Sequence, residues 1–206
     1  MSVDLAELVD APSTALITQE CQNGVLGERA VFPELAEVAR KHMIPNASRL
    51  AKAARAAGVP VIHCVVERRA DGLGSNTNAR LFAAARKAPV SFLPGTEAVQ
   101  VIPEIGVEET DLVLTRLHGL GPMGGTELDP ILRNLGVRTV VGMGVSLNVG
   151  MLSLVLDAVN AGYRFVLPRD AVAGVPEDYA EAVIDHTLSY VTTVVTTDDL
   201  VAAWSR

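Results

Sequence analysis

The chain has 206 residues, a length typical of a single α/β domain, and we expect one domain spanning residues 1–206. Its net charge of −7 argues against nucleic-acid binding, because an acidic surface repels a phosphate backbone. Two cysteines are too few for a disulfide framework. The first ten residues have no basic start and no apolar core of signal-peptide length, so we expect a cytoplasmic protein.

Aliphatic and β-branched runs alternate with helix-like segments along the chain. We predict strands at residues 14–19, 59–66, 111–117, 138–145, 164–167 and 192–196. We predict helices at residues 35–57, 78–87, 128–135, 149–161 and 176–190. Pro45 either splits the first of these helices or marks its true start. The alternation predicts a three-layer αβα domain, in which helices cover both faces of a mostly parallel, six-stranded, doubly wound, Rossmann-like sheet.

Three segments need separate interpretation. Residues 68–110 are polar, glycine-containing and broken by prolines, so a lid or insertion would lie there. The uncharged stretch 139–156 approaches the length of a membrane span, but its glycines favour a buried strand, a tight turn and a buried helix. The helix at 149–161 is apolar on nearly every face, so it is either covered by loops or packed at a subunit interface. We therefore expect a homo-oligomer, either a dimer or a tetramer.

Ligands of open parallel sheets bind outside the carboxyl ends of the strands. At that edge the predicted strands place Glu20, Arg116 and the turn that contains Gly150, with His118 in the glycine-rich loop that follows Arg116. Each has a structural alternative: Glu20 and Arg116 could be ion-pair partners, and His118 could be solvated. His63, inside a strand, is expected to be a hydrogen-bonded core residue, and Cys21 and Cys64 are expected to be small core residues.

The turn into the helix at 149–161 has the most specific local chemistry. The first backbone N–H groups of a helix, here around Val149 to Met151, lack intrahelical partners and lie at the positive end of the helix dipole. Such groups can hold a carboxylate or a developing oxyanion. Ser146 or Asn148 would cap this helix. The residues that we predict to bind substrate are Gln22, His118, Val145, Ser146, Asn148 and Met151.

The sequence offers no metal-ligand cluster at the end of the second predicted strand and no dinucleotide or P-loop motif, so we expect neither a metal nor a cofactor. The predicted partner is a small molecule, with no role for nucleic acid or membrane.

Several segments resemble, in order and spacing, the isochorismatase-like cysteine hydrolases. Residues 15–23 (Ala-Leu-Ile-Thr-Gln-Glu-Cys-Gln-Asn) are similar to that family's opening strand, an aliphatic run followed by Asp, any residue, Gln and Asn. Residues 125–128 (Gly-Thr-Glu-Leu), 132–137 (Leu-Arg-Asn-Leu-Gly-Val) and 144–150 (Gly-Val-Ser-Leu-Asn-Val-Gly) resemble further segments, the last being the family's nucleophile turn. The resemblance runs from residue 15 to about residue 203 and implies the same fold.

The resemblance also implies a site that departs from the usual pattern. The family's Asp, Lys and Cys triad corresponds here to Glu20, Arg116 and Gly150. Glycine supplies no thiolate, so we reject a covalent thioester mechanism at this position. Family members with a small residue there hydrolyse a vinyl ether after protonation by the acidic residue, which implies that Glu20 is the acid and Arg116 anchors a substrate carboxylate. Alternatively, Glu20 and Arg116 pair with each other and the chain is an inactive binding or scaffold protein.

Overall fold

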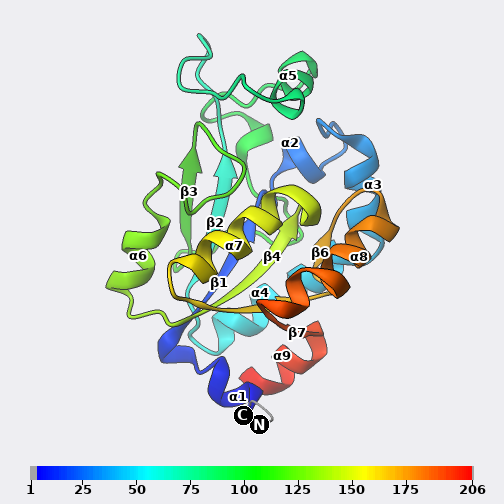
Figure 1. The fold of residues 1–206 in the computed structure, drawn as a ribbon. Helices are drawn as coiled ribbons and strands as arrows, with labels where there is room; N and C mark the ends of the chain where they lie inside the picture. The colour runs from blue at the N-terminus through cyan, green and yellow to red at the C-terminus, as the bar shows by residue number, and fades with distance from the viewer. Residues whose placement is uncertain (1–3, 206) are drawn as a thin grey trace.

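The computed structural model describes residues 4–205. Within them lies one sheet with the strands β1 Thr14–Gln19, β2 Val61–Val66, β3 Leu112–Arg116, β4 Thr139–Val145, β5 Arg164–Pro168, β6 Val172–Ala173 and β7 Thr193–Val195 (Figure 1). Every strand pairing is parallel. The predicted three-layer αβα class is confirmed. The sheet has seven strands rather than six, because the two-residue β6 that pairs with β4 is too short to leave a sequence pattern.

The helices of the described residues are α1 Leu5–Leu8, α2 Asn23–Leu26, α3 Pro33–Lys41, α4 Met43–Ala56, α5 Arg80–Lys87, α6 Leu128–Asn134, α7 Leu152–Asn160, α8 Glu177–His186 and α9 Thr197–Trp204. The predicted helix at 35–57 is thus two helices, which meet at His42. Pro45 lies in the first turn of α4, where its missing N–H costs no helical hydrogen bond. A π-helical turn, Leu147–Met151, precedes α7. The prediction missed α1, α2 and α9.

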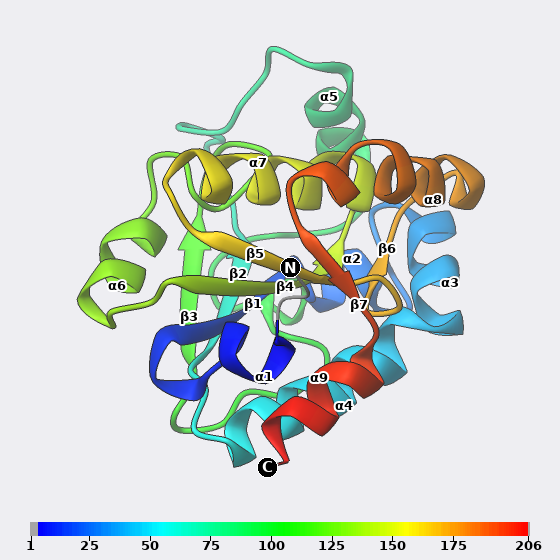
Figure 2. The same cartoon turned by 60° about the horizontal axis from the view of Figure 1, so that its bottom comes forward.

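Helices cover both faces of the sheet, as Figure 2 shows with α6, α7 and α8 on one side and α4 and α9 on the other. The side chains of β1 alternate between the two cores in the way a strand requires. Leu16 packs in the core shared with α3 and α4, whereas Ala15 and Ile17 pack in the core shared with α6 and α7. A strand buried on both faces needs a continuous apolar run, and this is the pattern that the sequence carries at β1.

The strand order, β3-β2-β1-β4-β5-β7, reverses direction between β1 and β4. The chain winds outward from β1 through β2 to β3 and then crosses back to begin the other half at β4. At the carboxyl end of this central pair, Gln19 stands beside Gly144. Gly144 has a φ of +123°, and a Cβ there would collide with the Gln19 backbone, so glycine is required for this close approach. The ends of β1 and β4 therefore lie at the topological switch point of the sheet.

The uncharged stretch at 139–156 forms β4, the π-helical turn and the start of α7, as predicted. No helix in residues 4–205 is long and apolar enough to cross a membrane. The outer face of α7 is not fully covered by loops, because Leu156 is 39 % exposed. Packing of this helix at a subunit interface stays a prediction.

Candidate active site

Glu20 directly follows β1 at the switch point, and its backbone is in an unusual conformation. Its φ is +52°, in the left-handed region, and it is the one non-glycine residue with a positive φ among residues 4–205. Holding such a conformation costs on the order of 1–3 kcal/mol, which the surrounding structure has to supply. The Glu20 N–H donates to the Cys64 carbonyl at 2.9 Å, so the backbone there is tied to β2. The backbone conformation of Glu20 therefore helps to set the direction in which its side chain leaves the sheet.

The two oxygens of the Glu20 carboxyl group have different surroundings. Oε1 accepts hydrogen bonds from Nη2 of Arg116 and, at 3.3 Å, from Nε2 of Gln19. Within the described residues Oε2 has no hydrogen-bond partner, and the Glu20 side chain is 22 % exposed. Arg116 and the glutamine amide nitrogen can only donate, so a proton carried by this carboxyl group resides on Oε2.

Arg116 lies behind Glu20 rather than in the open. Its side chain is only 3 % exposed, and its Nη2 also donates to the Leu120 carbonyl at 3.3 Å. Its Nε and Nη1 atoms are buried and have no partner among the described residues. Of the two outcomes that the sequence left open, the Glu20–Arg116 pair is the one that the structure shows, and the second oxygen of Glu20 stays without a partner among the described residues.

Gln19 fills the space beside Gly150, where any larger side chain at position 150 would begin. A Cβ on Gly150 would lie 2.8 Å from Nε2 of Gln19, 3.2 Å from the Leu120 carbonyl oxygen and 3.3 Å from the Val145 carbonyl oxygen. Gln19 is fully buried, and its Nε2 also donates to the Leu120 carbonyl at 3.3 Å. The space next to the Gly150 Cα is therefore occupied by a neighbouring amide.

The turn after β4 differs from its prediction in its hydrogen bonds. The N–H groups of Val149 and Met151 both donate to the Ser146 carbonyl, at 3.1 and 3.0 Å. They are therefore not the free donors predicted for an anion, because the helical turn begins at Leu147, two residues before the predicted start, and the Ser146 carbonyl is available as their acceptor. Ser146 occupies the N-cap position but makes no capping bond, since its hydroxyl donates to Oδ1 of Asn148 at 2.9 Å. Asn148 in turn donates to the Val175 carbonyl at 3.0 Å.

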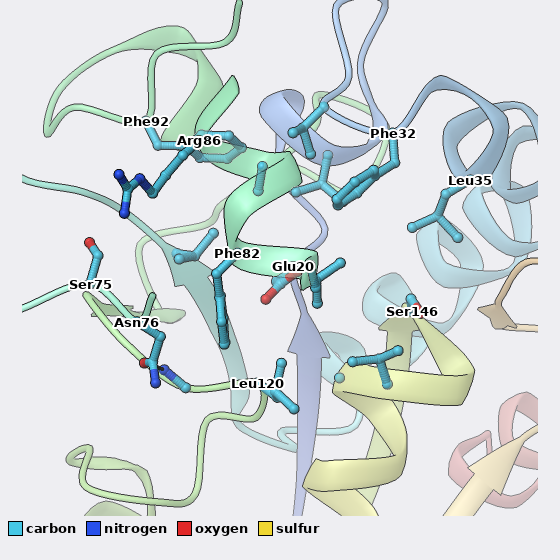
Figure 3. Close-up of a pocket in the computed structure, with 18 of the residues that line it drawn as sticks. Glu20, Phe32, Leu35, Ser75, Asn76, Phe82, Arg86, Phe92, Leu120 and Ser146 are labelled. Atoms are coloured by element: carbon cyan, nitrogen blue, oxygen red, sulfur yellow. Dashed lines mark hydrogen bonds between the residues drawn. The ribbon is translucent and has the colours of Figure 1, made fainter. Parts of the chain in front are cut away.

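A cavity of about 420 Å³ opens directly above the switch point (Figure 3). The structure brings together five of the predicted site residues along its lining, namely Glu20, His118, Ser146, Asn148 and Gly150. In Figure 3 the Glu20 carboxylate is directed toward the space beside Phe82, above Leu120. The volume falls within the range typical of small-molecule sites.

Four predicted site residues do not line this cavity: Gln22, Arg116, Val145 and Met151. Gln22 is fully buried, and its side chain bonds the backbone at both ends, accepting from the Val66 N–H at 2.7 Å and donating to the carbonyls of Val66 and Ala98 at 2.9 and 3.0 Å. It therefore joins β2 to the segment beyond α5. Val145 and Met151 belong to the apolar cores beneath the turn.

The chain matches a known protein family. The family model for the isochorismatase domain matches residues 14–199, nearly the whole of the described chain. The chain belongs to the isochorismatase family.

The matches within this hydrolase family are distant but extensive. The isochorismatase family protein YecD of Escherichia coli O157:H7 is 28 % identical over 186 residues, covering 86 % of this chain and 89 % of its own length. The ureidoacrylate amidohydrolase RutB of Rhizobium rhizogenes is 26 % identical over 208 residues, covering 94 % and 84 %. The solved structure of an isochorismatase family protein from Burkholderia thailandensis is 28 % identical, with a TM-score of 0.77 over 95 % of this chain and 97 % of that one.

Neither cysteine of this isochorismatase-family chain lines the cavity. Cys21 and Cys64 are buried in the two apolar cores, as predicted. Burial raises the pKa of the Cys64 thiol to about 12, and burial together with the nearby Glu20 carboxylate raises that of Cys21 well above its ordinary value. Residues 4–205 contain no cluster of three metal-ligating side chains.

The sequence reasoning missed the roof of the cavity. A lid or an insertion is expected within residues 68–110, and the structure places Arg68, Phe82, Arg86 and Phe92 from this segment along the lining, where they form the roof. Phe32, which precedes α3, lines the opposite wall. The chain has only four phenylalanines, and three of them line this cavity. In a sequence this poor in aromatic residues, each phenylalanine outside a predicted strand or core helix is a candidate for contact with a ligand.

Proposed function

We propose that this chain is a hydrolase that acts on a small anionic molecule by proton transfer, without a covalent thioester, and that vinyl-ether hydrolysis suits the site better than amide hydrolysis. One observation carries the proposal: Glu20 offers a carboxyl oxygen with no hydrogen-bond partner to a cavity that neither cysteine lines. A thiolate is the usual nucleophile for splitting an amide through an acyl intermediate, whereas a vinyl ether needs only a proton and water.

The proposed reaction balances with Glu20 and one water. Oε2 of the Glu20 carboxyl group gives its proton to the terminal carbon of the substrate's C=C bond, and the carbon that bears the ether oxygen becomes an oxocarbenium centre. Water adds to this centre and returns a proton to Glu20. The resulting hemiketal breaks its bond to the ether oxygen and yields a ketone and an alcohol. Glu20 thereby ends the cycle in the state in which it began.

Arg116 and Gly150 take supporting roles in this proposal. Arg116 is behind the carboxylate and not on the lining, so we assign it to positioning Glu20 instead of anchoring substrate. Gly150 leaves room for the Gln19 amide that also donates to Glu20. Ser146, Asn148 and His118 line the cavity and remain the candidates for contact with substrate.

A second candidate is a binding protein with the same fold and no turnover. The observation that favours it is the direct Glu20–Arg116 pair, which satisfies one oxygen of the proposed acid before any ligand arrives. RutB, named an amidohydrolase, adds amide hydrolysis as a third outcome that an experiment has to separate.

The experiment uses two probes of similar size, 2-phenoxyacrylate, a vinyl ether, and hippurate, an amide, each with one carboxylate. We expect the wild-type chain to convert 2-phenoxyacrylate to phenol and a 2-oxo acid, and NMR in D₂O to find deuterium in the new methyl group. Glu20→Gln should lower this rate by about 10²–10⁴-fold, the usual contribution of acid–base catalysis. Glu67→Gln is the matched control, because Glu67 follows the neighbouring strand and does not line the cavity.

Three results would count against the proposal. Unchanged turnover in Glu20→Gln would remove Glu20 as the proton donor. Hydrolysis of hippurate alone would favour amide chemistry. Tight binding of either probe with no turnover by the wild-type chain would favour the binding protein.

A further inference from the structure

Three of the four phenylalanines of this chain lie around the same cavity. Aromatic residues make up only 4 % of the sequence, yet Phe32, Phe82 and Phe92 all line the cavity, and the fourth phenylalanine, Phe165, is in the core. Figure 3 shows the three rings on different walls, with Phe82 reaching down from α5. Flat rings offer their best contact to a flat partner, in stacked or edge-to-face arrangements. The walls of this cavity therefore suit a planar apolar group.

Two guanidinium groups, those of Arg68 and Arg86, line the same part of the cavity as Phe82 and Phe92. Arg68 donates to the Ala85 carbonyl at 3.1 Å and stacks on Phe92 with its Cζ 5.3 Å from the ring centroid. Arg86, on the exposed side of α5, lines the cavity as well (Figure 3). Among the ion pairs of residues 4–205, neither arginine has a carboxylate within 4.0 Å.

The two arginines also influence each other. Burial lowers the pKa of Arg68, and the positive charge of Arg86 lowers it further, while the Glu20 carboxylate acts in the opposite direction. Arg68 is half-buried and Arg86 is exposed, and neither pairs with a carboxylate among residues 4–205, so both can still bind an anion. A guanidinium pair is well suited to a carboxylate, because its N–H groups match the two oxygens.

We propose that the cavity binds a monocarboxylate with a planar apolar body, the carboxylate at Arg68 and Arg86 and the body between the phenylalanine rings. This names the substrate class of the function proposed above and rests on it. The other ionisable side chains on the lining are Glu20, Glu34 and His118. A second carboxylate, at the far end of a ligand, would approach Glu20 or Glu34, so the site should discriminate against dicarboxylates.

The test measures binding without turnover, by titration calorimetry with three probes: 3-phenylpropionate, its neutral amide 3-phenylpropionamide, and succinate. We expect 3-phenylpropionate to bind at least about tenfold more tightly than the amide, since a charge-assisted bond to arginine is stronger than a neutral one. Succinate should bind more weakly than either aryl compound, because it has no ring and two charges.

Variants separate the two parts of the site. Arg86→Gln should remove most of the preference for the carboxylate over the amide and leave amide affinity unchanged. Phe82→Ala should weaken both aryl probes by a similar factor. Arg80→Gln is the matched control, because Arg80 begins the same helix and does not line the cavity. Arg86 and Arg80 are both exposed, so neither variant should disturb folding.

The proposal is overturned if the acid and the amide bind equally, if succinate binds as tightly as 3-phenylpropionate, if Arg80→Gln acts like Arg86→Gln, or if no probe binds. Titrating the Glu20→Gln variant distinguishes this failure from a failure of the proposed function. Retained binding of 3-phenylpropionate there, together with absent turnover in the wild-type chain, would leave the assignment of ligand class intact while removing the hydrolase.

Discussion

Replacing Gly150 with alanine tests whether Gln19 truly occupies the space beside it. Alanine is favoured over glycine in a helical turn by about 1 kcal/mol. The added Cβ would, however, lie 2.8 Å from Nε2 of Gln19, well inside ordinary van der Waals contact. Inserting a methyl group into a packed site costs about 1–3 kcal/mol, and displacing Gln19 also weakens its bond to Glu20. We expect Gly150→Ala to lower the free energy of unfolding by about 1–2 kcal/mol.

The same substitution made in a Gln19→Ala chain should behave differently. Gln19→Ala alone removes a buried side chain and is itself destabilising, but it clears the atom nearest to the new Cβ. The remaining neighbours, the carbonyl oxygens of Leu120 and Val145 at 3.2 and 3.3 Å, are tight and do not overlap. We expect the cost of Gly150→Ala to fall to about zero in this background, which is a coupling of about 1–2 kcal/mol between the two positions.

This coupling is measured by urea unfolding, followed by circular dichroism, of four proteins: the wild type, Gly150→Ala, Gln19→Ala and the double variant. Gly124→Ala is the matched control, because no atom lies within 4 Å of where its Cβ would be and it should not couple to Gln19. If the Gln19 and Gly150 substitutions add to within about 0.5 kcal/mol, the two side chains do not compete for the same volume and the reasoning is refuted.

Three further predictions concern buried groups. Burial lowers the pKa of His63 below its ordinary 6.5, so the unfolded chain binds a proton that the folded chain does not, and the free energy of unfolding should fall as the pH drops below 6.5, by up to about 1.4 kcal/mol per pH unit. His63→Gln should flatten this slope in urea titrations between pH 5 and 7. Asp111→Asn removes the carboxylate 2.6 Å from the buried Arg55 and should cost on the order of 3 kcal/mol in the same assay. Cys21 and Cys64 should not react with a thiol reagent at pH 8 until the chain is unfolded, because burial raises both pKa values.

Controls for these predictions are available in the chain. Glu108→Gln removes an exposed carboxylate 3.4 Å from Arg55 and should cost less than about 1 kcal/mol. An equal cost for Glu108→Gln and Asp111→Asn would contradict the role assigned to burial. A slope unchanged by His63→Gln would place the acid sensitivity elsewhere, and rapid labelling of the native thiols would show that the cores open.

The layers, and the sheet edge at which the candidate site lies, could be predicted from the sequence because they depend on local patterns. The apolar run of β1 predicts a strand buried on both faces, and the turn after β4 predicts a helix start at the same edge of the sheet. Glu20 and Gly150 therefore come together as expected. The two-residue β6 and the four-residue α1 and α2 have no period long enough to recognise.

The details that the sequence could not give are those that depend on side-chain packing between distant segments. Strand alternation does not predict that the Gln19 amide contacts Gly150, which is 131 positions away in the sequence. Nor does it predict that Arg116 is buried behind Glu20 and does not line the cavity. The π-helical turn begins two residues before the predicted helix start and satisfies the N–H groups that the sequence predicts to be free. The roof formed by Arg68, Phe82, Arg86 and Phe92 could not be predicted because these side chains are spread over a segment without a clear pattern.

The contact between Gln19 and Gly150 also constrains how such a sequence can vary over time. A larger residue at 150 has to move the end of the Gln19 side chain, so we expect the two positions to covary among homologues: a chain with a larger residue at 150 should carry a smaller or differently directed one at 19. A single replacement of Gly150 by cysteine would place the new Cβ 2.8 Å from that amide. A path between this site and one with a side chain at that point would therefore include a rearrangement or a replacement of Gln19.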